Sequence, residues 1–583
     1  MSEVSGKAFD YSLFRRVLSY SRPYRLTFVL TGILTVLSAA LGPVRPLLIQ
    51  HTLDNTVLKP DPQALIWMTL LMLFFLFFEA ITQYYQSYLA NWVGQSIIKD
   101  IRVEVYQRIS SFKLKYFDRT PIGTLVTRCI SDIETIANIF SDGILIIIGD
   151  ILKLVFVLAI MFYTDWRLTL FSISTIPLLL VATRIFQRSI KSAFQDVRTQ
   201  VSRLNTFVQE HITGMNIVQI FNREAREMKK FEEINRGHMK AHIRTVYANA
   251  IFFPVVEILS ACSLAFLVWW GGKEAISDRV SFGNLVAFIL YIYMLYRPIR
   301  QLADRFNILQ MGMVGSERVF KVIDTESHIE NKGIQTAEQI KGEIEFKNVW
   351  FAYKDEDWVL KDLSFKIQPG QKVAFVGATG AGKSSVVNLL SRFYEFQKGQ
   401  ITIDGKDIRE YELSSLRSHV GVVLQDVFLF SDSILNNISL GNPDISKEEI
   451  IQASKAVGAH KFIDRLPGDY EFDVKERGGV LSVGQRQLLA FIRAYVYNPE
   501  ILILDEATSS VDTDSELMIQ EASEKVTQGR TSLIIAHRLA TIQQADQIIV
   551  MEKGKIIEQG THRELLEQGG HYKLLFDMQF KDN

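Results

Sequence analysis

Cysteine is almost missing from this chain, since only Cys129 and Cys262 occur among its 583 residues. The two lie far apart and form no C-x-x-C pair or His/Cys cluster, which argues against a disulfide framework and a zinc site. Net charge is also missing, because 64 basic residues balance 64 acidic residues. A neutral chain lacks the basic surface of a general nucleic-acid binder, so we expect no nucleic-acid partner.

The N-terminus lacks the short apolar core and the small-residue cleavage site of a secretory signal peptide. It begins MSEVSGKAFDYSLFRR and stays polar and charged up to the first long apolar segment. We therefore expect no cleaved leader, and the first apolar segment would serve as the insertion signal.

Long apolar segments are abundant, and they all precede residue 325. A hydrocarbon core of about 30 Å requires about 20 helical residues. The segments of that length are 26–49, 65–92, 140–163, 168–187, 246–271 and 281–302. Six buried helices of a soluble domain are the alternative, but segments with so little polar face would leave such a domain without a water-facing surface. The sequence predicts a bundle of six transmembrane helices.

Basic residues are concentrated in two of the connections between these segments. The connection 93–139 holds Lys99, Arg102, Arg108, Lys113, Lys115, Arg119 and Arg128. The connection 188–245 is similarly basic, whereas 50–64 and 272–280 hold few basic residues. The positive-inside rule therefore predicts that 93–139, 188–245 and both ends of the chain are cytoplasmic.

The two basic connections have the apolar spacing of helices and few glycines or prolines. We expect the membrane helices to continue through them as long cytoplasmic extensions. Each extension should turn around near a short helix, close to Phe117–Leu125 and Thr213–Phe221.

The polar segment 323–341 lacks apolar periodicity and is a predicted linker. It separates a predicted transmembrane domain, 1–322, from a predicted soluble domain, 342–583. The soluble part opens with strand-like alternation and continues with an α/β pattern.

Residues 377–384 read GATGAGKS and match the P-loop pattern G-x-x-x-x-G-K-[ST]. An apolar strand precedes the motif and a segment with helical spacing follows it, which is the context that a P-loop requires. Glycines let the backbone N–H groups point at phosphates, Lys383 binds the β- and γ-phosphates, and the Ser384 hydroxyl can bind Mg²⁺. The predicted nucleotide-binding residues here are Gly377, Ala378, Thr379, Gly380, Ala381, Gly382, Lys383, Ser384 and Ser385.

Residues 501–506 read ILILDE, a run of aliphatic residues typical of a buried parallel strand. Asp505 lies at its carboxyl end, where it can hold Mg²⁺ directly or through water. Glu506 would polarise the water that attacks the γ-phosphate. Together with the P-loop, this pattern predicts an α/β P-loop ATPase domain fused to the membrane bundle.

Further motifs make the soluble half resemble the nucleotide-binding domain of an ABC transporter. They are GATGAGKSS, LQD, LSVGQRQLLAFIRA, ILILDEATSSVD and AHR, and the pattern LSxGQ is the signature of that family. The segments YFDRTPIGTLVTR and MVGSERVF resemble the exporter class, in which a membrane domain and a nucleotide-binding domain are fused in this order. The resemblance covers nearly the whole chain.

The resemblance implies roles for residues throughout the soluble half. Tyr353 would stack on adenine, and Gln425 would contact Mg²⁺ and the membrane domain. Glu506, His537 and Lys383 would act in hydrolysis. The signature loop, which contacts the ATP held by the other subunit, would be Leu481, Ser482, Val483, Gly484 and Gln485. The D-loop would span Ser510 to Asp512, and the Mg²⁺ ligands would be Ser384, Gln425 and Asp505.

One chain contains one P-loop and one signature loop, so neither completes an ATP site alone. Two chains placed head to tail would enclose two ATP molecules, and the expected partner is a second half-transporter. Val483 departs from the family pattern, which has glycine there, and valine disfavours positive φ and adds bulk. Both a homodimer and a heterodimer fit this departure.

The resemblance implies ATP-driven export or flipping of hydrophobic or amphipathic molecules, lipids or drugs, by alternating access. It places the chain in a lipid bilayer, the bacterial inner (plasma) membrane. A peptide exporter, an ATP-gated channel and a regulatory subunit of a heterodimer are the alternatives. Glu79 and Glu257 have no obvious local partner in the sequence, and if they line the cavity they favour a cationic amphipath.

Overall fold

The chain forms two compact units. The structure is a computed structural model that describes residues 10–58, 61–277, 279–329, 331, 333, 335–337, 339–506, 513–536 and 538–580, without the side chains of 142, 299–304, 306, 307, 506, 513–515, 579 and 580. One unit consists of Met1–Ser110 and Ile122–Thr325, and the other of Ser111–Pro121 and Glu326–Asn583. The segment 111–121 thus belongs to the second unit, although it joins two helices of the first. The domain division at 322 and 342 stays a prediction.

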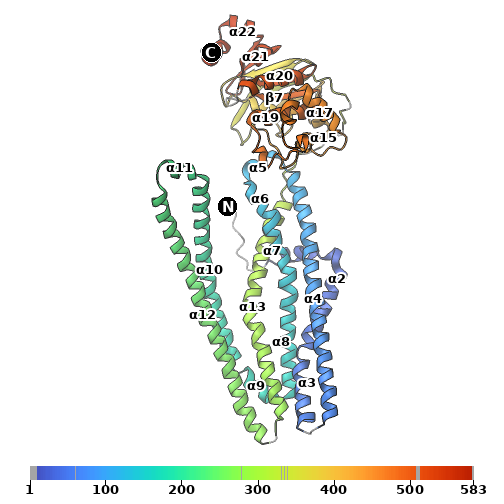
Figure 1. Cartoon of the computed structure of the whole chain (residues 1–583), viewed down its shortest axis with the longest axis vertical. Helices are drawn as coiled ribbons and strands as arrows, with labels where there is room; N and C mark the ends of the chain where they lie inside the picture. Colours follow the sequence, from blue (N-terminus) through green and yellow to red (C-terminus); the bar gives the residue numbers. More distant parts are fainter. Residues whose placement is uncertain are drawn as a thin grey trace. The chain divides into compact units, whose positions relative to one another are not determined.

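The first unit is built from helices (Figure 1). They are α1 (Tyr11–Ser19), α2 (Arg25–Leu41), α3 (Val44–Thr52), α4 (Pro62–Ser110), α6 (Ile122–Thr127), α7 (Ile133–Asn138), α8 (Leu145–Thr164), α9 (Trp166–Ile173), α10 (Ile176–Thr213), α11 (Met215–Ile220), α12 (Glu224–Ile276) and α13 (Phe282–Ile323). Short 3₁₀ and π-helical turns lie at Arg22–Tyr24, Leu53–Val57, Arg128–Asp132 and Ile139–Ile144.

Among the described residues, 5 helical stretches are long and apolar enough to cross a membrane. They are Arg22–Val57, Pro62–Ser110, Ile122–Thr164, Trp166–Thr213 and Glu224–Ile276. The sixth predicted segment, 281–302, lies in α13, some of whose side chains are outside the described residues. The prediction of a helical membrane bundle is confirmed.

The predicted helical continuations and the short helices near their turning points are present. α4 continues unbroken to Ser110, and the short helix α5 (Leu114–Arg119) follows it. α10 and α12 run side by side, and α11 joins their ends (Figure 1).

The N-terminal helix α1 fastens two later helices to each other. Arg16 donates hydrogen bonds of 2.6 and 2.7 Å to the carboxylate of Asp324, and its guanidinium lies 4.2 Å from the ring centre of Phe320. Tyr20 stacks on Phe320 at 5.8 Å and donates a 2.8 Å hydrogen bond to Glu104 of α4. The end of α13 and the later part of α4 therefore share one anchor.

The second unit contains two sheets. An antiparallel sheet has the order β2-β1-β4-β5, and a mainly parallel sheet has the order β10-β9-β3-β8-β7-β6. The strands are β1 (Ile344–Ala352), β2 (Trp358–Ile367), β3 (Lys372–Val376), β4 (Lys398–Ile403), β5 (Lys406–Asp407), β6 (Val420–Val423), β7 (Ile501–Glu506), β8 (Thr531–Ala536), β9 (Gln547–Glu552) and β10 (Lys555–Gly560).

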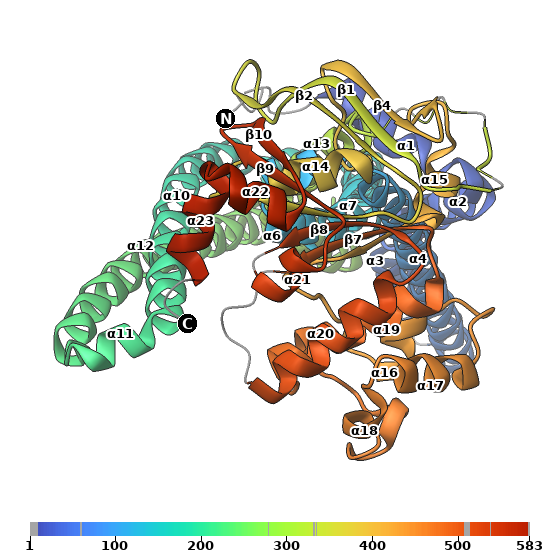
Figure 2. The same cartoon turned by 90° about the horizontal axis from the view of Figure 1, so that it is seen from above.

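Helices cover these sheets, and in Figure 2 α16 to α20 gather on the side away from β1, β2 and β4. The helices are α14 (Lys383–Leu390), α15 (Leu413–Ser418), α16 (Ile434–Ser439), α17 (Lys447–Ala456), α18 (His460–Ile463), α19 (Val483–Tyr497), α20 (Thr513–Thr527), α21 (Leu539–Gln543), α22 (His562–Gln568) and α23 (His571–Phe580).

Strand β7 shows why its sequence is a continuous aliphatic run. Leu502 and Leu504 belong to one hydrophobic core, whereas Ile501 and Ile503 belong to another. Successive side chains point to opposite faces of a sheet, so both faces of β7 are buried. The acidic residues that end this strand are therefore held on a rigid, fully covered element.

Candidate nucleotide-binding site

The glycine-rich loop 377–384 joins the carboxyl end of β3 to α14. Gly382 has a φ of 106°, a backbone conformation that favours glycine, and a Cβ there would lie 2.7 Å from Cδ2 of Leu360. A Cβ on Gly377 would overlap the carbonyl oxygen of Met551 in β9. Both glycines are therefore needed for the loop to fold against its neighbours.

Lys383 is the first residue of α14 and is 7% exposed. Its Nζ donates hydrogen bonds to the carbonyl oxygens of Gly377 at 2.6 Å and Ala378 at 3.1 Å. Burial lowers the pKa of Lys383, and the negative charge of Asp505 opposes this shift. Burial raises the pKa of Asp505, which Lys383 opposes and the neighbouring Asp426 reinforces. Lys383 and Asp505 thus lie close enough for their charges to interact.

The carboxyl ends of neighbouring parallel strands assemble this site at one edge of the sheet. The order β3-β8-β7-β6 places the strand that ends at Ala536 between the P-loop strand and the strand that ends at Asp505 and Glu506. β6 ends shortly before Gln425, which is exposed, as is Ser384 in the first turn of α14. The predicted residues Ser510, Asp512 and His537, and the side chain of Glu506, lie outside the described residues.

Tyr353 follows β1 and reaches back to α14. Its hydroxyl lies 3.1 Å from Oγ of Ser385 and accepts a 3.1 Å hydrogen bond from Nδ2 of Asn388. Its ring packs edge-to-face against Phe351 at 4.6 Å and Tyr394 at 5.0 Å. The structure therefore brings two predicted nucleotide-binding residues, Tyr353 and Ser385, into direct contact.

The signature segment Leu481–Gln485 begins α19. Ser482 caps the helix, because its Oγ accepts the backbone N–H of Gln485 at 3.2 Å and its own N–H donates to Oε1 of Gln485 at 2.9 Å. Val483 is the first helical residue and its side chain is 43% exposed. Residue 483 does not adopt a positive φ, because the capping box places it in the helix, where β-branched residues are tolerated.

Replacing Val483 with glycine is expected to raise the ATPase rate severalfold. The family resemblance implies that the first N–H groups of α19 bind a phosphate of ATP. The exposed isopropyl group of Val483 would hinder the approach of that phosphate to these N–H groups. The measurement is the phosphate-release rate of the full chain in nanodiscs. Val480→Gly is the matched control, because Val480 is also exposed but precedes the signature. A rate for Val483→Gly that equals or falls below that of the original chain would contradict this expectation.

Three residues near the site escaped the sequence analysis: Asn388, Tyr394 and Asp118. Tyr394 is 8% exposed, and its hydroxyl donates a hydrogen bond to the carboxylate of Asp118 in α5. Asp118 lies in the YFDRTP segment that carries the exporter resemblance, but that segment gives no sign of a contact with Tyr394. The pair is 276 residues apart in the sequence, which leaves no local signal.

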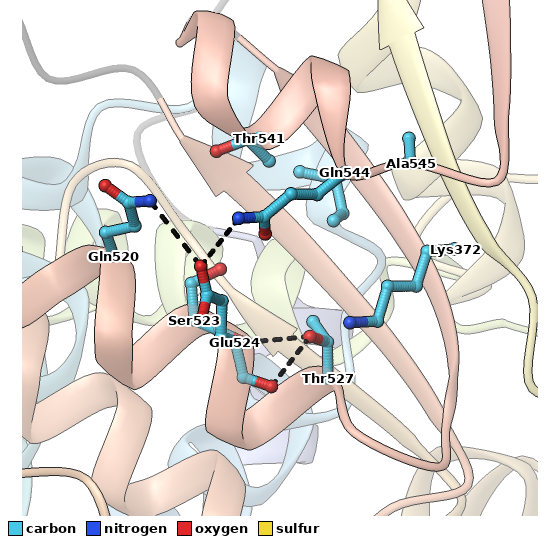
Figure 3. A pocket seen from close by; sticks show the side chains of 9 residues that line it. Lys372, Gln520, Ser523, Glu524, Thr527, Thr541, Gln544 and Ala545 are labelled. Atoms are coloured by element: carbon cyan, nitrogen blue, oxygen red, sulfur yellow. Dashed lines mark hydrogen bonds between the residues drawn. The ribbon is translucent and has the colours of Figure 1, made fainter. Parts of the chain in front are cut away.

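A polar crevice lies between α20 and α21 (Figure 3). Its volume is about 20 Å³, which is room for about one water molecule and too little for a nucleotide. Nε2 of Gln544 donates to Oε1 of Glu524 at 2.8 Å across it. This hydrogen bond thus connects α20 to the C-terminal end of α21.

Charged side chains in the membrane helices form a second group of candidate residues. Nη2 of Arg45 on α3 donates a 2.5 Å hydrogen bond to Oε2 of Glu79 on α4. Glu79 has no local partner in the sequence, and the structure supplies one from a neighbouring helix, 34 residues away. Because Arg45 neutralises the charge of Glu79, this residue no longer favours a cationic substrate.

Comparison with known proteins identifies the family. Residues 28–299 match the family model described as the ABC transporter transmembrane region, and residues 360–509 match the one described as ABC transporter. The uncharacterized ABC transporter ATP-binding protein YknV of Bacillus subtilis is 37% identical over 99% of this chain and 96% of that protein. The chain belongs to the ABC transporter family.

Other relatives of this ABC transporter match over similar lengths. The ATP-dependent lipid A-core flippase of Syntrophus aciditrophicus is 36% identical over 98% of this chain and 95% of that protein. A Bacillus subtilis protein provisionally named multidrug export ATP-binding/permease protein YgaD is 36% identical over 97% of this chain and 99% of that protein. The predicted family is thereby confirmed.

The transporter joins one membrane region to one ATP-binding region and is an exporter half-transporter. It is an integral membrane protein that binds ATP, and its ATPase activity drives export. The half-transporter architecture implies a dimer in a lipid bilayer. The predictions of fold class, ATPase activity and exporter function are confirmed.

Proposed function

We propose that the transporter flips or exports an amphipathic lipid with an anionic headgroup. The observation that carries this proposal is a group of basic residues near Asp150 in the membrane helices. Lys153, Arg297 and Arg305 all interact electrostatically with this carboxylate. Ionisable groups inside membrane spans mark substrate pathways more often than they serve packing alone.

The cations come from different parts of the bundle. Lys153 lies one turn after Asp150 on α8, whereas Arg297 and Arg305 lie on α13, which packs against α8. The junction of α2 and α3 also approaches, since a Cβ on Gly42 would lie 3.2 Å from Cε of Lys153. A phosphate or carboxylate headgroup would be attracted to these cations and could form charge-assisted hydrogen bonds with them.

The names of two relatives agree with a lipid. The proteins of Syntrophus aciditrophicus and Alkalilimnicola ehrlichii, 36% and 34% identical to this chain, are both named ATP-dependent lipid A-core flippase. Drug export is the second candidate, because the name of YgaD refers to multidrug export.

An anionic lipid is expected to stimulate the ATPase of the full chain severalfold in nanodiscs of zwitterionic lipid. The stimulation should fall in Lys153→Gln and Arg297→Gln, because each change removes a cation near Asp150. Arg279→Gln is the matched control, since Arg279 lies in the connection before α13 and is well exposed. Equal stimulation by zwitterionic and anionic lipids with the same acyl chains, or full stimulation of both variants, would contradict the proposed substrate.

Different residues of the ATP site bind the phosphates, the adenine and Mg²⁺. The P-loop residues 377–385 and Lys383 bind the phosphates, and Tyr353 stacks on adenine. Mg²⁺ fits the oxygen donors of Ser384, Gln425 and Asp505, because it prefers oxygen ligands, and when bound there it would neutralise phosphate charge.

Hydrolysis uses residues at the ends of the parallel strands. Glu506 acts as the general base on the attacking water, and His537 and the Ser510–Asp512 loop complete the site. The signature loop Leu481–Gln485 of one chain contacts the ATP that the other chain holds, so ATP binding closes the dimer and hydrolysis opens it.

The termini and the ATP-binding unit lie on the cytoplasmic side of a bacterial plasma membrane. The basic residues of 93–139 and 188–245 support this orientation. The chain divides into a transmembrane domain at 1–322, a linker at 323–341 and a nucleotide-binding domain at 342–583.

A further inference from the structure

Tyr353, which is proposed to stack on adenine, is hydrogen-bonded to residues of α14. Its hydroxyl shares a 3.1 Å hydrogen bond with Oγ of Ser385 and accepts another from Asn388. Ser385 is 4% exposed and lies in the first turn of α14, within the proposed phosphate-binding stretch. A nucleotide that bound at this stretch would therefore compete with the phenol for the Ser385 hydroxyl.

A cavity beside Tyr353 offers its ring a second position. The cavity has a volume of about 180 Å³, and a cavity of about 150 Å³ already holds a benzene molecule. Its lining includes Tyr353, Tyr394, Lys113, Lys115, Ile329 and Gln397. Among the described residues, the lining does not include the P-loop, so a ring that turned into this cavity would leave Ser385.

Tyr394 connects Tyr353 to the segment 111–121. Its ring packs at 5.0 Å from that of Tyr353, and its hydroxyl is hydrogen-bonded to Asp118. Burial and the bond to Asp118 raise the pKa of Tyr394, so its hydroxyl stays protonated and remains a donor. A displacement of the Tyr353 ring would therefore reach Tyr394 first and Asp118 next.

The segment 111–121 is held to the second unit at its start as well. The backbone N–H of Lys113 donates a 2.6 Å hydrogen bond to the carbonyl oxygen of Ser327, and Phe112 forms a β-bridge with His328. The chain then passes through α5 and returns to the membrane unit at α6. This segment is thus a covalent link between the neighbourhood of the ATP site and two long helices.

We propose that Tyr353 is a latch that ATP displaces from Ser385, and that Tyr394 passes this displacement to the segment 111–121 through Asp118. The inference rests on the proposed binding of ATP at the P-loop and Ser385. Tyr394 acts as a positioning residue, because it contacts the base-stacking residue and not the reacting atoms.

The latch is tested by Tyr353→Phe, which keeps the ring for stacking and removes the competing hydroxyl. The dissociation constant for ATP, measured calorimetrically on the full chain in nanodiscs, is expected to fall roughly two- to tenfold, the effect of one net hydrogen bond. An unchanged or weaker affinity would overturn the latch. Loss of ATP binding in Lys383→Ala tests the proposed ATP site separately, so failure of the latch and failure of the site can be told apart.

The proposed relay, in which Tyr394 passes the displacement of Tyr353 to the segment 111–121, is tested by amide hydrogen exchange. The exchange is measured at residues 112–119 of the full chain, with and without the non-hydrolysable ATP analogue AMP-PNP. The analogue is expected to change this exchange in the original chain but not in Tyr394→Phe, although both bind AMP-PNP with equal affinity. Tyr411→Phe is the matched control, because its buried hydroxyl bonds only to the carbonyl oxygen of Ile403 among the contacts described, at 3.1 Å. A response that persists in Tyr394→Phe, or that is missing in the original chain, would overturn the relay.

Discussion

Replacing Glu506 with glutamine is expected to lower the ATPase rate about a thousandfold while ATP still binds. General-base catalysis contributes about 10²- to 10⁴-fold, and an amide cannot accept the proton of the attacking water. The residue ends β7 beside Asp505, and the P-loop and Lys383 remain unchanged, so binding should persist. The measurement is phosphate release at saturating Mg²⁺ and ATP, together with the dissociation constant for ATP.

The matched control for this change is Glu552→Gln. Glu552 ends β9, a neighbour of β3 in the same sheet, so its replacement removes the same charge from another strand end. The control should hydrolyse ATP at the original rate. A Glu506→Gln protein that kept more than about a tenth of the rate would lack the expected dependence on a general base.

The second large effect is expected for Lys383→Ala, which should raise the dissociation constant for ATP by at least about a hundredfold. Each hydrogen bond to a charged group contributes about 1.5–3 kcal/mol, and Lys383 is proposed to bind two phosphates. Asp505 would also lose the positive charge that opposes the effect of burial on its pKa, so this pKa would rise further.

Lys372→Ala is the control for the lysine. Lys372 is the first residue of β3, the strand that leads into the P-loop. Its side chain lines the polar crevice of Figure 3. Its removal should leave ATP binding intact. ATP binding by Lys383→Ala that matched this control would show that the phosphates are held elsewhere.

The strands that carry the ATP site were predictable because their chemistry is local. The run ILIL before Asp505 indicates a strand buried on both faces, and the structure places its alternate residues in two cores. The P-loop pattern likewise fixes glycines where a side chain would strike Leu360 or Met551. Such features depend on spacing along a few residues, which a sequence displays directly.

The helical backbone of Val483 was predictable but was missed. Ser482 and Gln485 have the S-x-x-Q spacing of a capping box, and that pattern alone places residue 483 in the first turn of a helix. The family pattern has glycine at this position, but it does not show where the helix begins. The local helix signal decides the backbone conformation here, and it gives valine no strain.

Contacts between distant segments could not be predicted in this way. The partner of Glu79 is on another helix, and the partner of Tyr394 is 276 residues away. The bond from Tyr353 to Ser385 depends on how β1 packs against α14. No periodicity in one sequence specifies such pairs, because they are set by the tertiary arrangement of whole elements.

The anchor formed by Arg16 and Tyr20 ties the start of the chain to the end of α13. These residues precede every apolar segment. They contact the last turn of α13, which leads into the proposed linker, and Tyr20 also bonds to α4. A fragment trimmed to the first apolar segment would insert as well but would leave that last turn loose. A spectroscopic label attached near residue 10 would, by the same logic, travel with the end of α13 and report its position during turnover.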